Sequence, residues 1–253
     1  MPILGVIASS MLAQAPVAPV LWLDASDTST ISLSGSAVTE WRDKSGNAYA
    51  FAQGTSGYRP VSGTETQNGK NVIVFGTDDL LQSTAAASVW KFLHSTVNTI
   101  FVAVKPTSSE FILTTNADAS GNIGINMGQK ATNALEHNIS RGVGGSLVCA
   151  NRSANNSLGT AFTYVTILVD PANATAANRS DIRFEQGAAT KNNVLTNAVS
   201  TSDPNSTLRI GASLAGRTDS MVGQIGEILI YGSKLSAAEV LTVQQDLAAK
   251  WNV

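Results

Sequence analysis

The sequence predicts an all-β fold: an antiparallel β-sandwich of the jelly-roll type, with a C-terminal helix and an extended N-terminal arm. Between residues 97 and 232, short runs of alternating apolar and polar residues are separated by turns rich in Gly, Asn, Asp and Ser. A period of two is typical of strands with one buried face. Many such strands at short spacing predict a sandwich or jelly roll.

Nine segments fit this strand pattern. They are bounded by turn residues, which mark where one strand ends and the next begins. The expected strands are Val97–Lys105, Glu110–Thr115, Gly121–Met127, Ala134–Ser140, Ser146–Ala150, Phe162–Asp170, Asp181–Gln186, Thr207–Ala212 and Gly223–Gly232.

The last eighteen residues predict a helix. Ser236 is followed three residues later by Glu239, which is the spacing of a capping box. An apolar stripe at spacings of three or four then predicts one face packed on the sandwich; it consists of Val240, Val243, Leu247 and Trp251. A second, short helix is expected at Ala87–His94.

Composition restricts the classes of function. The chain of 253 residues is long enough for one large β domain, which we place at residues 21–253. Its formal net charge is −2 and it has no basic cluster, so we expect no nucleic-acid partner. The single cysteine, Cys149, and two histidines, His94 and His137, make zinc and Cys–His catalysis poor candidates.

Residues 1–20 carry no charge and form the expected docking arm. They lack the positive end of a secretory signal and are too short to cross a bilayer, so we expect no membrane span. Pro16 and Pro19 favour an extended lead-in. The side chains expected to dock on a partner are Ile3, Leu4, Val6, Ile7, Met11 and Leu12.

The segment from Leu21 to Asn47 contains acidic and aromatic clusters with two interpretations. Asp24, Asp27 and Asp43 are candidate calcium ligands because calcium binds several nearby carboxylates. The same residues are good turn formers, and we favour that role, with no cofactor. Trp22 and Trp41 could stack on a sugar, but their strand-like context favours the core, as for Trp251.

The acidic residues do not suggest a hydrolase. A retaining glycosidase needs two carboxyl groups about 5–5.5 Å apart. Glu227 alternates with Leu229 and Tyr231, so its strand supplies no second carboxylate. Around Arg183, the acids Asp181 and Glu185 fit an ion-pair ladder better than an acid/base pair. We therefore expect no enzyme activity and name no catalytic residue.

Four segments resemble a known family. "LWLDASD", "VTEWRDKSGN", "NGKNVIVFGTDDLL" and "IGEILIYGSKLSAAEVLTVQQDLAAKWNV" are similar to the laminin-G-like, concanavalin-A-like jelly roll of bacterial and phage proteins. Phe75, Gly76, Asp78 and Leu80 follow most of one family segment. The resemblance covers about residues 20 to 253 and implies the fold. It says little of function, although such domains often carry a calcium ion.

The first ten residues, "MPILGVIASS", resemble the lead of tailed-phage virion proteins. This resemblance implies a non-enzymatic virion surface protein, either a head decoration or fibre protein or a tail-tip or tail-fibre component. Its arm would join other virion proteins, and its domain would face outward, toward host glycans. Homo-oligomers, including trimers, suit such assemblies. The alternatives are an extracellular carbohydrate-binding module of a secreted bacterial protein and, less favoured, a glycan hydrolase.

No residue is assigned to glycan binding from the sequence. We expect any host-facing contact on the Asn-, Ser- and Gly-rich segments at 139–145, 149–157 and 173–180. Loops of β-sandwiches commonly carry binding sites.

Overall fold

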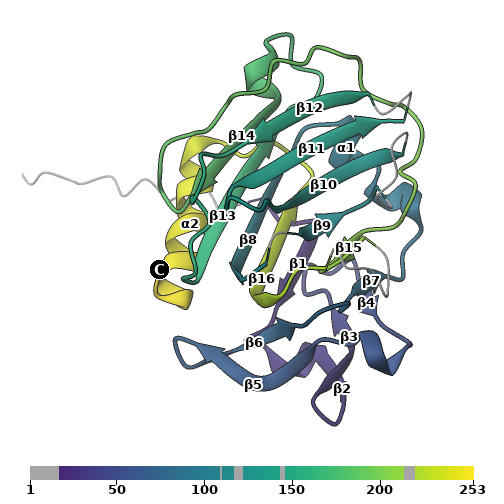
Figure 1. The fold of residues 1–253 in the computed structure, drawn as a ribbon, viewed down its shortest axis with the longest axis vertical. Coiled ribbons are helices and arrows are strands. Elements are labelled where there is room, and N and C mark those ends of the chain that lie inside the picture. The colour runs from purple at the N-terminus through teal and green to yellow at the C-terminus, as the bar shows by residue number, and fades with distance from the viewer. Residues whose placement is uncertain (1–16, 109, 117–121, 143–145, 214–219) are drawn as a thin grey trace, which may run out of the picture.

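The computed structural model describes residues 17–108, 110–116, 122–142, 146–213 and 220–253. Within them the chain forms an antiparallel β-sandwich with a C-terminal helix, α2 (Ala237–Trp251), on the outside of one layer (Figure 1). This arrangement confirms the all-β prediction.

One layer contains the strands in front in Figure 1. Its strand order is β12, β11, β10, β9, β15, β7 and β4. The bounds of these strands, in chain order, are β4 (Ala50–Ala52), β7 (Leu81–Ser83), β9 (Phe111–Thr114), β10 (Ile123–Gln129), β11 (Leu135–Arg141), β12 (Leu147–Arg152) and β15 (Arg209–Ile210).

The second layer lies behind the first and is built around the long strand β16, which is buried along its whole length. Its strands are β1 (Leu21–Asp24), β6 (Lys70–Phe75), β8 (Asn98–Pro106), β13 (Thr163–Val169), β14 (Ser180–Phe184) and β16 (Gly223–Tyr231). Strands β1 and β6 pair with different parts of β16, while β8 pairs along nearly all of it.

Three further strands join the layers at one end of the molecule (Figure 1). They are β2 (Ile31–Ser34), β3 (Ala37–Arg42) and β5 (Val61–Gln67). Because β3 bonds to both β4 and β5, the hydrogen-bonded path passes from one layer to the other without a break. The nine strands expected from the sequence are all present, with ends shifted by a few residues.

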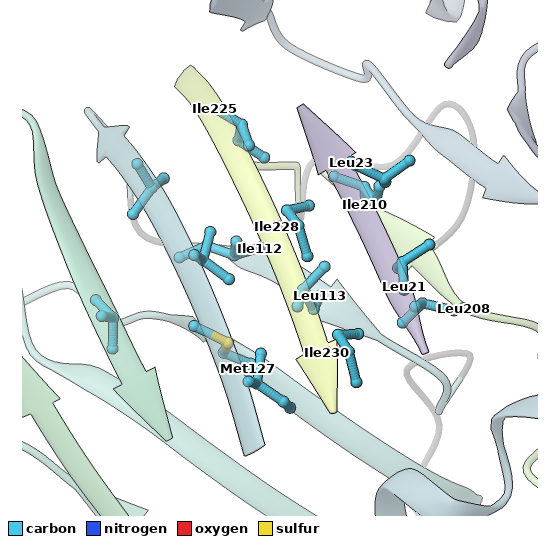
Figure 2. Close-up of a cluster of buried hydrophobic side chains, with 14 of the residues drawn as sticks. Leu21, Leu23, Ile112, Leu113, Met127, Leu208, Ile210, Ile225, Ile228 and Ile230 are labelled. Carbon is cyan, nitrogen blue, oxygen red and sulfur yellow. The ribbon is translucent and has the colours of Figure 1, made fainter. Parts of the chain in front are cut away.

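The main core lies between the two layers. Figure 2 shows Leu21, Leu23 and Ile228 from one layer pointing toward Ile112 and Met127 from the other. Each of these side chains is fully buried. At about 25 cal/mol per Å² of apolar surface removed from water, such burial is the main stabilising term of the sandwich.

A second core lies between the outer face of the second layer and α2. Val240, Val243, Leu247 and Trp251 are buried there, as the apolar stripe predicts. The capping box is present: Glu239 Oε2 accepts from the Ser236 N–H at 2.7 Å, and Ser236 Oγ accepts from the Glu239 N–H at 3.3 Å. These bonds fix where the helix begins.

The other helices are short. The expected helix at residues 87–94 is a 3-10 turn, η3 (Ala87–Trp90), followed by α1 (Phe92–Ser95). The remaining 3-10 turns are η1 (Thr28–Thr30), η2 (Ser56–Tyr58) and η4 (Ala176–Arg179). No helix in the described ranges has the length and apolar character needed to cross a membrane.

Candidate functional site

The three aspartates at residues 24, 27 and 43 form one repeated kind of turn. Asp24 accepts hydrogen bonds from the N–H of Ser26 at 3.0 Å and from its hydroxyl at 2.6 Å. Asp27 binds Ser29 in the same way, at 3.3 and 2.6 Å, and Asp43 binds Ser45 at 2.8 and 2.6 Å. Each carboxylate therefore closes an Asp-x-Ser turn, the role that turn chemistry predicts.

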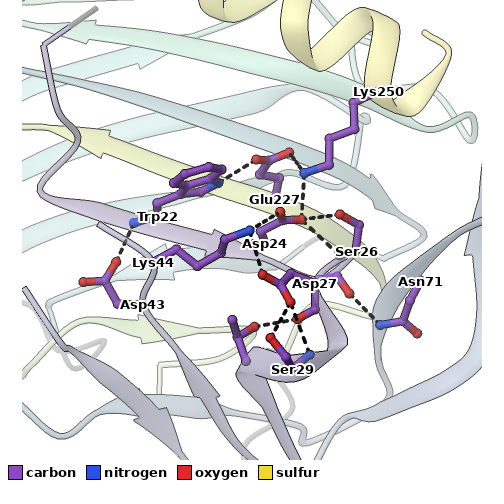
Figure 3. A network of polar contacts seen from close by, with 12 residues as sticks. Trp22, Asp24, Ser26, Asp27, Ser29, Asp43, Lys44, Asn71, Glu227 and Lys250 are labelled. Carbon is purple, nitrogen blue, oxygen red and sulfur yellow. Dashed lines mark hydrogen bonds and ion pairs between the residues drawn. The ribbon is translucent and has the colours of Figure 1, made fainter. Parts of the chain in front are cut away.

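Two lysines also bind these carboxylates (Figure 3). Lys44 Nζ lies 2.9 Å from a carboxylate oxygen of both Asp24 and Asp27, and Lys250 Nζ lies 2.7 Å from Asp24. Burial raises the pKa of Asp24, but hydrogen bonds from Lys250, Ser26 and Lys44 outweigh it and hold the pKa below its usual value. Asp24 is thus a buried, ionised carboxylate neutralised by two ammonium groups.

Glu227 extends this network to the helix. It lies opposite Asp24 on the neighbouring strand and pairs with Lys250 at 2.8 Å. Its carboxylate also accepts from the indole N–H of Trp22 at 2.7 Å and of Trp251 at 3.0 Å. Glu227 therefore ties β1, β16 and α2 together.

The acidic residues of the first strands are occupied by protein partners. Ammonium groups stand against Asp24 and Asp27, where a bound cation would otherwise balance their charge. Among the described residues, no group of three or more His, Cys, Asp or Glu side chains is placed to hold a metal ion. Calcium binding by Asp24, Asp27 and Asp43 stays a prediction, and this geometry favours the turn role.

The tryptophans are mostly core residues. Trp41, Trp90 and Trp251 are fully buried. Trp22 differs from the prediction: Leu21 and Leu23 point into the main core, so Trp22 points to the outer face of β1, where it is half-buried. Alternation along a strand dictates this placement. The Lys44 ammonium lies 4.5 Å from the centre of its ring.

An apolar groove lies beside α2 on the outer face of the second layer. Its volume is about 310 Å³, and its walls come from the first described residues, from β1 and β16, and from α2. The lining residues are Val17, Pro19, Trp22, Glu227, Leu229, Tyr231, Val243, Asp246, Leu247 and Lys250.

A more polar pocket of about 280 Å³ opens further along the same outer face. Three neighbouring strands set its floor, because Gln224 on β16 lies opposite both Val74 on β6 and Lys105 on β8. Glu65 on β5 and Thr107 complete the polar part of the lining. Gln224 donates a hydrogen bond to Glu65.

The polar pocket combines groups that suit a small polar ligand. Gln224 and Glu65 offer an amide and a carboxylate, and Thr107 donates its hydroxyl to Val222 O at 3.0 Å. Lys105 adds a cationic side chain to the lining. Val74, Phe75 and Val222 supply the apolar part. Sequence reasoning missed this set because its residues are far apart in the chain.

The outer face of the first layer is also polar. Asn126, Asn138 and Ala150 lie side by side on β10, β11 and β12, and Glu136 lies beside Arg152. A small hollow on this face, bordered by Phe111 and Gly128, has a volume of about 10 Å³. That space holds about one water molecule.

The three segments expected to face a host are partly buried, apart from residues 143–145, which lie outside the described residues. Residues 139–141 belong to β11, and Asn151 is fully buried in β12, where it donates to Ser180 O at 2.9 Å. Arg179 is also buried and binds backbone carbonyls of Asn173, Val148, Asn197 and Thr196. Side chains that satisfy buried backbone groups are structural.

The expected ion-pair ladder is present in part. Arg183 binds Asp181 through two nitrogens at 3.1 and 2.7 Å. Glu185 instead accepts a hydrogen bond from Thr163 at 3.2 Å. The arm residues Ile3, Leu4, Val6, Ile7, Met11 and Leu12 lie outside the described residues.

Of the comparisons with known proteins, only the one with solved structures found similar proteins. No family model matches the chain, and no curated protein matches its sequence. Among solved structures, a Trypanosoma rangeli sialidase in complex with 2,3-difluorosialic acid is similar with a TM-score of 0.59 and 13% identity over 92% of this chain. The receptor-binding domain of botulinum neurotoxin D has a TM-score of 0.58 and 12% identity over 90% of this chain.

These likenesses show that the chain has a β-sandwich fold. The chain spans 33% of the sialidase chain and 52% of the neurotoxin chain that it matches. At such low identity the shared feature is the fold.

Proposed function

We propose that this chain is a non-catalytic carbohydrate-binding protein of a tailed-phage virion surface. Its β-sandwich binds a bacterial surface glycan in the polar pocket formed by Glu65, Lys105, Thr107 and Gln224. Its N-terminal arm attaches it to other virion proteins as part of a head decoration, fibre or tail-tip structure. Copies assemble as homo-oligomers on the particle.

The polar pocket is the observation that supports glycan binding. Its volume of about 280 Å³ is near the lower end of known ligand pockets, which begin at about 300 Å³. A sugar ring presents hydroxyl groups at its edge and C–H groups on its faces. Lys105, Gln224 and Glu65 match the hydroxyl groups, and Val74 and Val222 match the C–H groups.

The acidic residues give no comparable support for hydrolysis. Asp24 and Glu227 lie opposite one another, as a pair of catalytic carboxylates would. Lys250 bridges them, however, and Ser26, Trp22 and Trp251 occupy further positions on their oxygens. A proton donor needs a raised pKa, whereas the pKa of Asp24 is lowered.

The fold is compatible with the proposed role, since the structurally similar proteins include a sialidase solved with a sialic acid derivative and a receptor-binding domain. We base the virion part on the sequence: the resemblance of the first ten residues to phage virion leads and the uncharged residues 1–20.

The test is binding of fluorescently labelled full-length protein to intact bacteria, before and after enzymatic removal of their surface polysaccharide. We expect binding that disappears with the polysaccharide. The variant Lys105→Ala should bind about tenfold to a hundredfold more weakly, because a hydrogen bond to a charged group contributes about 1.5–3 kcal/mol.

Lys70→Ala is the matched control, because it removes the same charge from β6 outside the pocket. It should bind as the unchanged protein does. Binding that survives removal of the polysaccharide contradicts glycan recognition. Equal binding by Lys105→Ala and the unchanged protein contradicts the assignment of the pocket.

A further inference from the structure

The apolar groove beside α2 is built to receive apolar side chains. Leu229, Tyr231, Val243 and Leu247 form much of its lining, and they are more than nine-tenths buried. Val17 also lines the groove and is 50% exposed. An apolar surface left open in this way commonly marks a contact site.

The floor of the groove is rigid. Trp22 is fixed by its indole hydrogen bond to Glu227 and by the Lys44 ammonium over its ring. Lys250, on α2, reaches across to Asp24 and Glu227 and holds the helix in place (Figure 3). A preformed surface binds with little loss of conformational entropy.

The described chain begins at this groove. Val17 and Pro19 are part of its lining, so the sixteen preceding residues are tethered directly to it. That segment carries no charge, and Met11 and Leu12 are its nearest large apolar residues. Leu12 lies five residues before Val17 and can be at most about 18 Å away along an extended chain.

We propose that the groove binds the apolar side chains of residues 3–12 of the same chain. A tether this short gives an effective concentration on the order of millimolar, which favours the chain's own segment over a second copy. Docking would shield an apolar segment that otherwise promotes aggregation of the free protein. This proposal is independent of glycan binding. It concerns the free protein, in which the arm has not yet bound another virion protein.

Disulfide trapping in the full-length protein tests the proposal. The double variant Leu12→Cys with Asp246→Cys places one thiol on the segment and one on the exposed rim of the groove. Leu12→Cys with Val194→Cys is the control, because Val194 is 81% exposed and is absent from the groove lining. The native Cys149 is buried, and burial raises its thiol pKa to about 12, so it does not compete.

We expect the groove pair to form an intramolecular disulfide under mild oxidation at least about tenfold faster than the control pair, because docking raises the local thiol concentration. Adding Ile3→Asp and Ile7→Asp should remove this difference. Adding Ser9→Asp and Ser10→Asp, which introduces equal charge at polar positions, should preserve it.

Two outcomes overturn the proposal. Equal rates for the two cysteine pairs mean that the segment does not occupy the groove. A disulfide-linked dimer that forms faster with protein concentration means that the occupant comes from a second copy. Neither readout involves a glycan or a particle. A result that contradicts docking of the arm can therefore be told apart from a result that contradicts the proposed function.

Discussion

At the residue scale, the most consequential group is the ion network around Asp24, Glu227 and Lys250. Both carboxylates are about nineteen-twentieths buried, and Lys250 bonds to each of them. A buried carboxylate without a partner is strongly destabilising, because it loses its hydration without compensation. Lys250 therefore links α2 to both β1 and β16.

Replacing Lys250 by Met should lower the free energy of unfolding by about 3 kcal/mol, as expected when one partner leaves a buried pair. Chemical denaturation measures this loss. Lys234→Met is the control, because Lys234 forms an exposed pair with Asp170 at 3.5 Å and should change stability by less than about 0.5 kcal/mol. Equal effects of the two variants would show that the network contributes no more than a surface pair.

His137 is a second buried polar residue with a measurable consequence. Its Nδ1 lies 3.0 Å from Ser180 Oγ, and its Nε2 has no partner among the described residues. Burial lowers its pKa from 6.5 to about 4, since a charged imidazolium would be desolvated there. The folded state therefore holds His137 neutral.

The sign of the pH dependence follows from this shift. Between pH 6.5 and about 4 the unfolded chain binds a proton at His137 and the folded chain does not, so stability falls as pH falls. The loss attributable to His137 is about 3 kcal/mol over that window. Denaturation of the unchanged protein and of His137→Asn at several pH values should show a shallower acid slope in the variant. Parallel slopes would contradict the prediction.

At the element scale, β16 and α2 fit together through one glycine. Gly226 lies at an irregularity in the pairing of β16 with β8. A side chain there would meet the Trp251 ring at 2.8 Å and the Phe162 ring at 2.9 Å. Those two rings stack with centroids 5.4 Å apart. The missing side chain thus lets the helix end pack closely on the sheet.

The start of α2 is set by the capping box of Ser236 and Glu239. Ser236→Ala removes the side-chain cap of α2 and should cost about 1 kcal/mol of stability. Thr242→Ala, in the same helix, loses an exposed bond to Ala238 O and gains helix propensity, so it should be nearly neutral. Thermal or chemical denaturation compares the stability of the two variants. Equal losses of stability would show that the loss in Ser236→Ala does not come from the capping box.

Helix α2 and the nine strands expected between residues 97 and 232 could be predicted because their signals are local. Alternation marked the strands, and the Ser236–Glu239 spacing marked the start of α2. The prediction that Trp22 lies in the core is wrong in part: Leu21 and Leu23 take the inner face of β1, so alternation leaves Trp22 half-buried on the outer face. The pairing of Lys250 with Asp24 could not be predicted, because it joins residues 226 positions apart through the fold.

At the scale of the whole molecule, strand order creates the candidate site. Lys105, Gln224 and Glu65 meet only because β8, β16 and β6 are neighbours in the second layer and β5 pairs with β6. No local pattern encodes that order, so the sequence predicted the sandwich but not its pocket. The same order sets α2 and the first described residues around the apolar groove, on the same outer face.

The measurement that tests the central claim most directly is mapping of backbone amide NMR shifts while the protein is titrated with an oligosaccharide from the surface polysaccharide of a bacterium that it binds. We predict that the largest shifts occur at Glu65, Lys105, Thr107 and Gln224. In Lys105→Ala the same shifts should need about tenfold to a hundredfold more oligosaccharide. Shifts centred on the outer face of the first layer around Asn126, Asn138 and Arg152, or no shifts at all, would contradict glycan binding in the polar pocket.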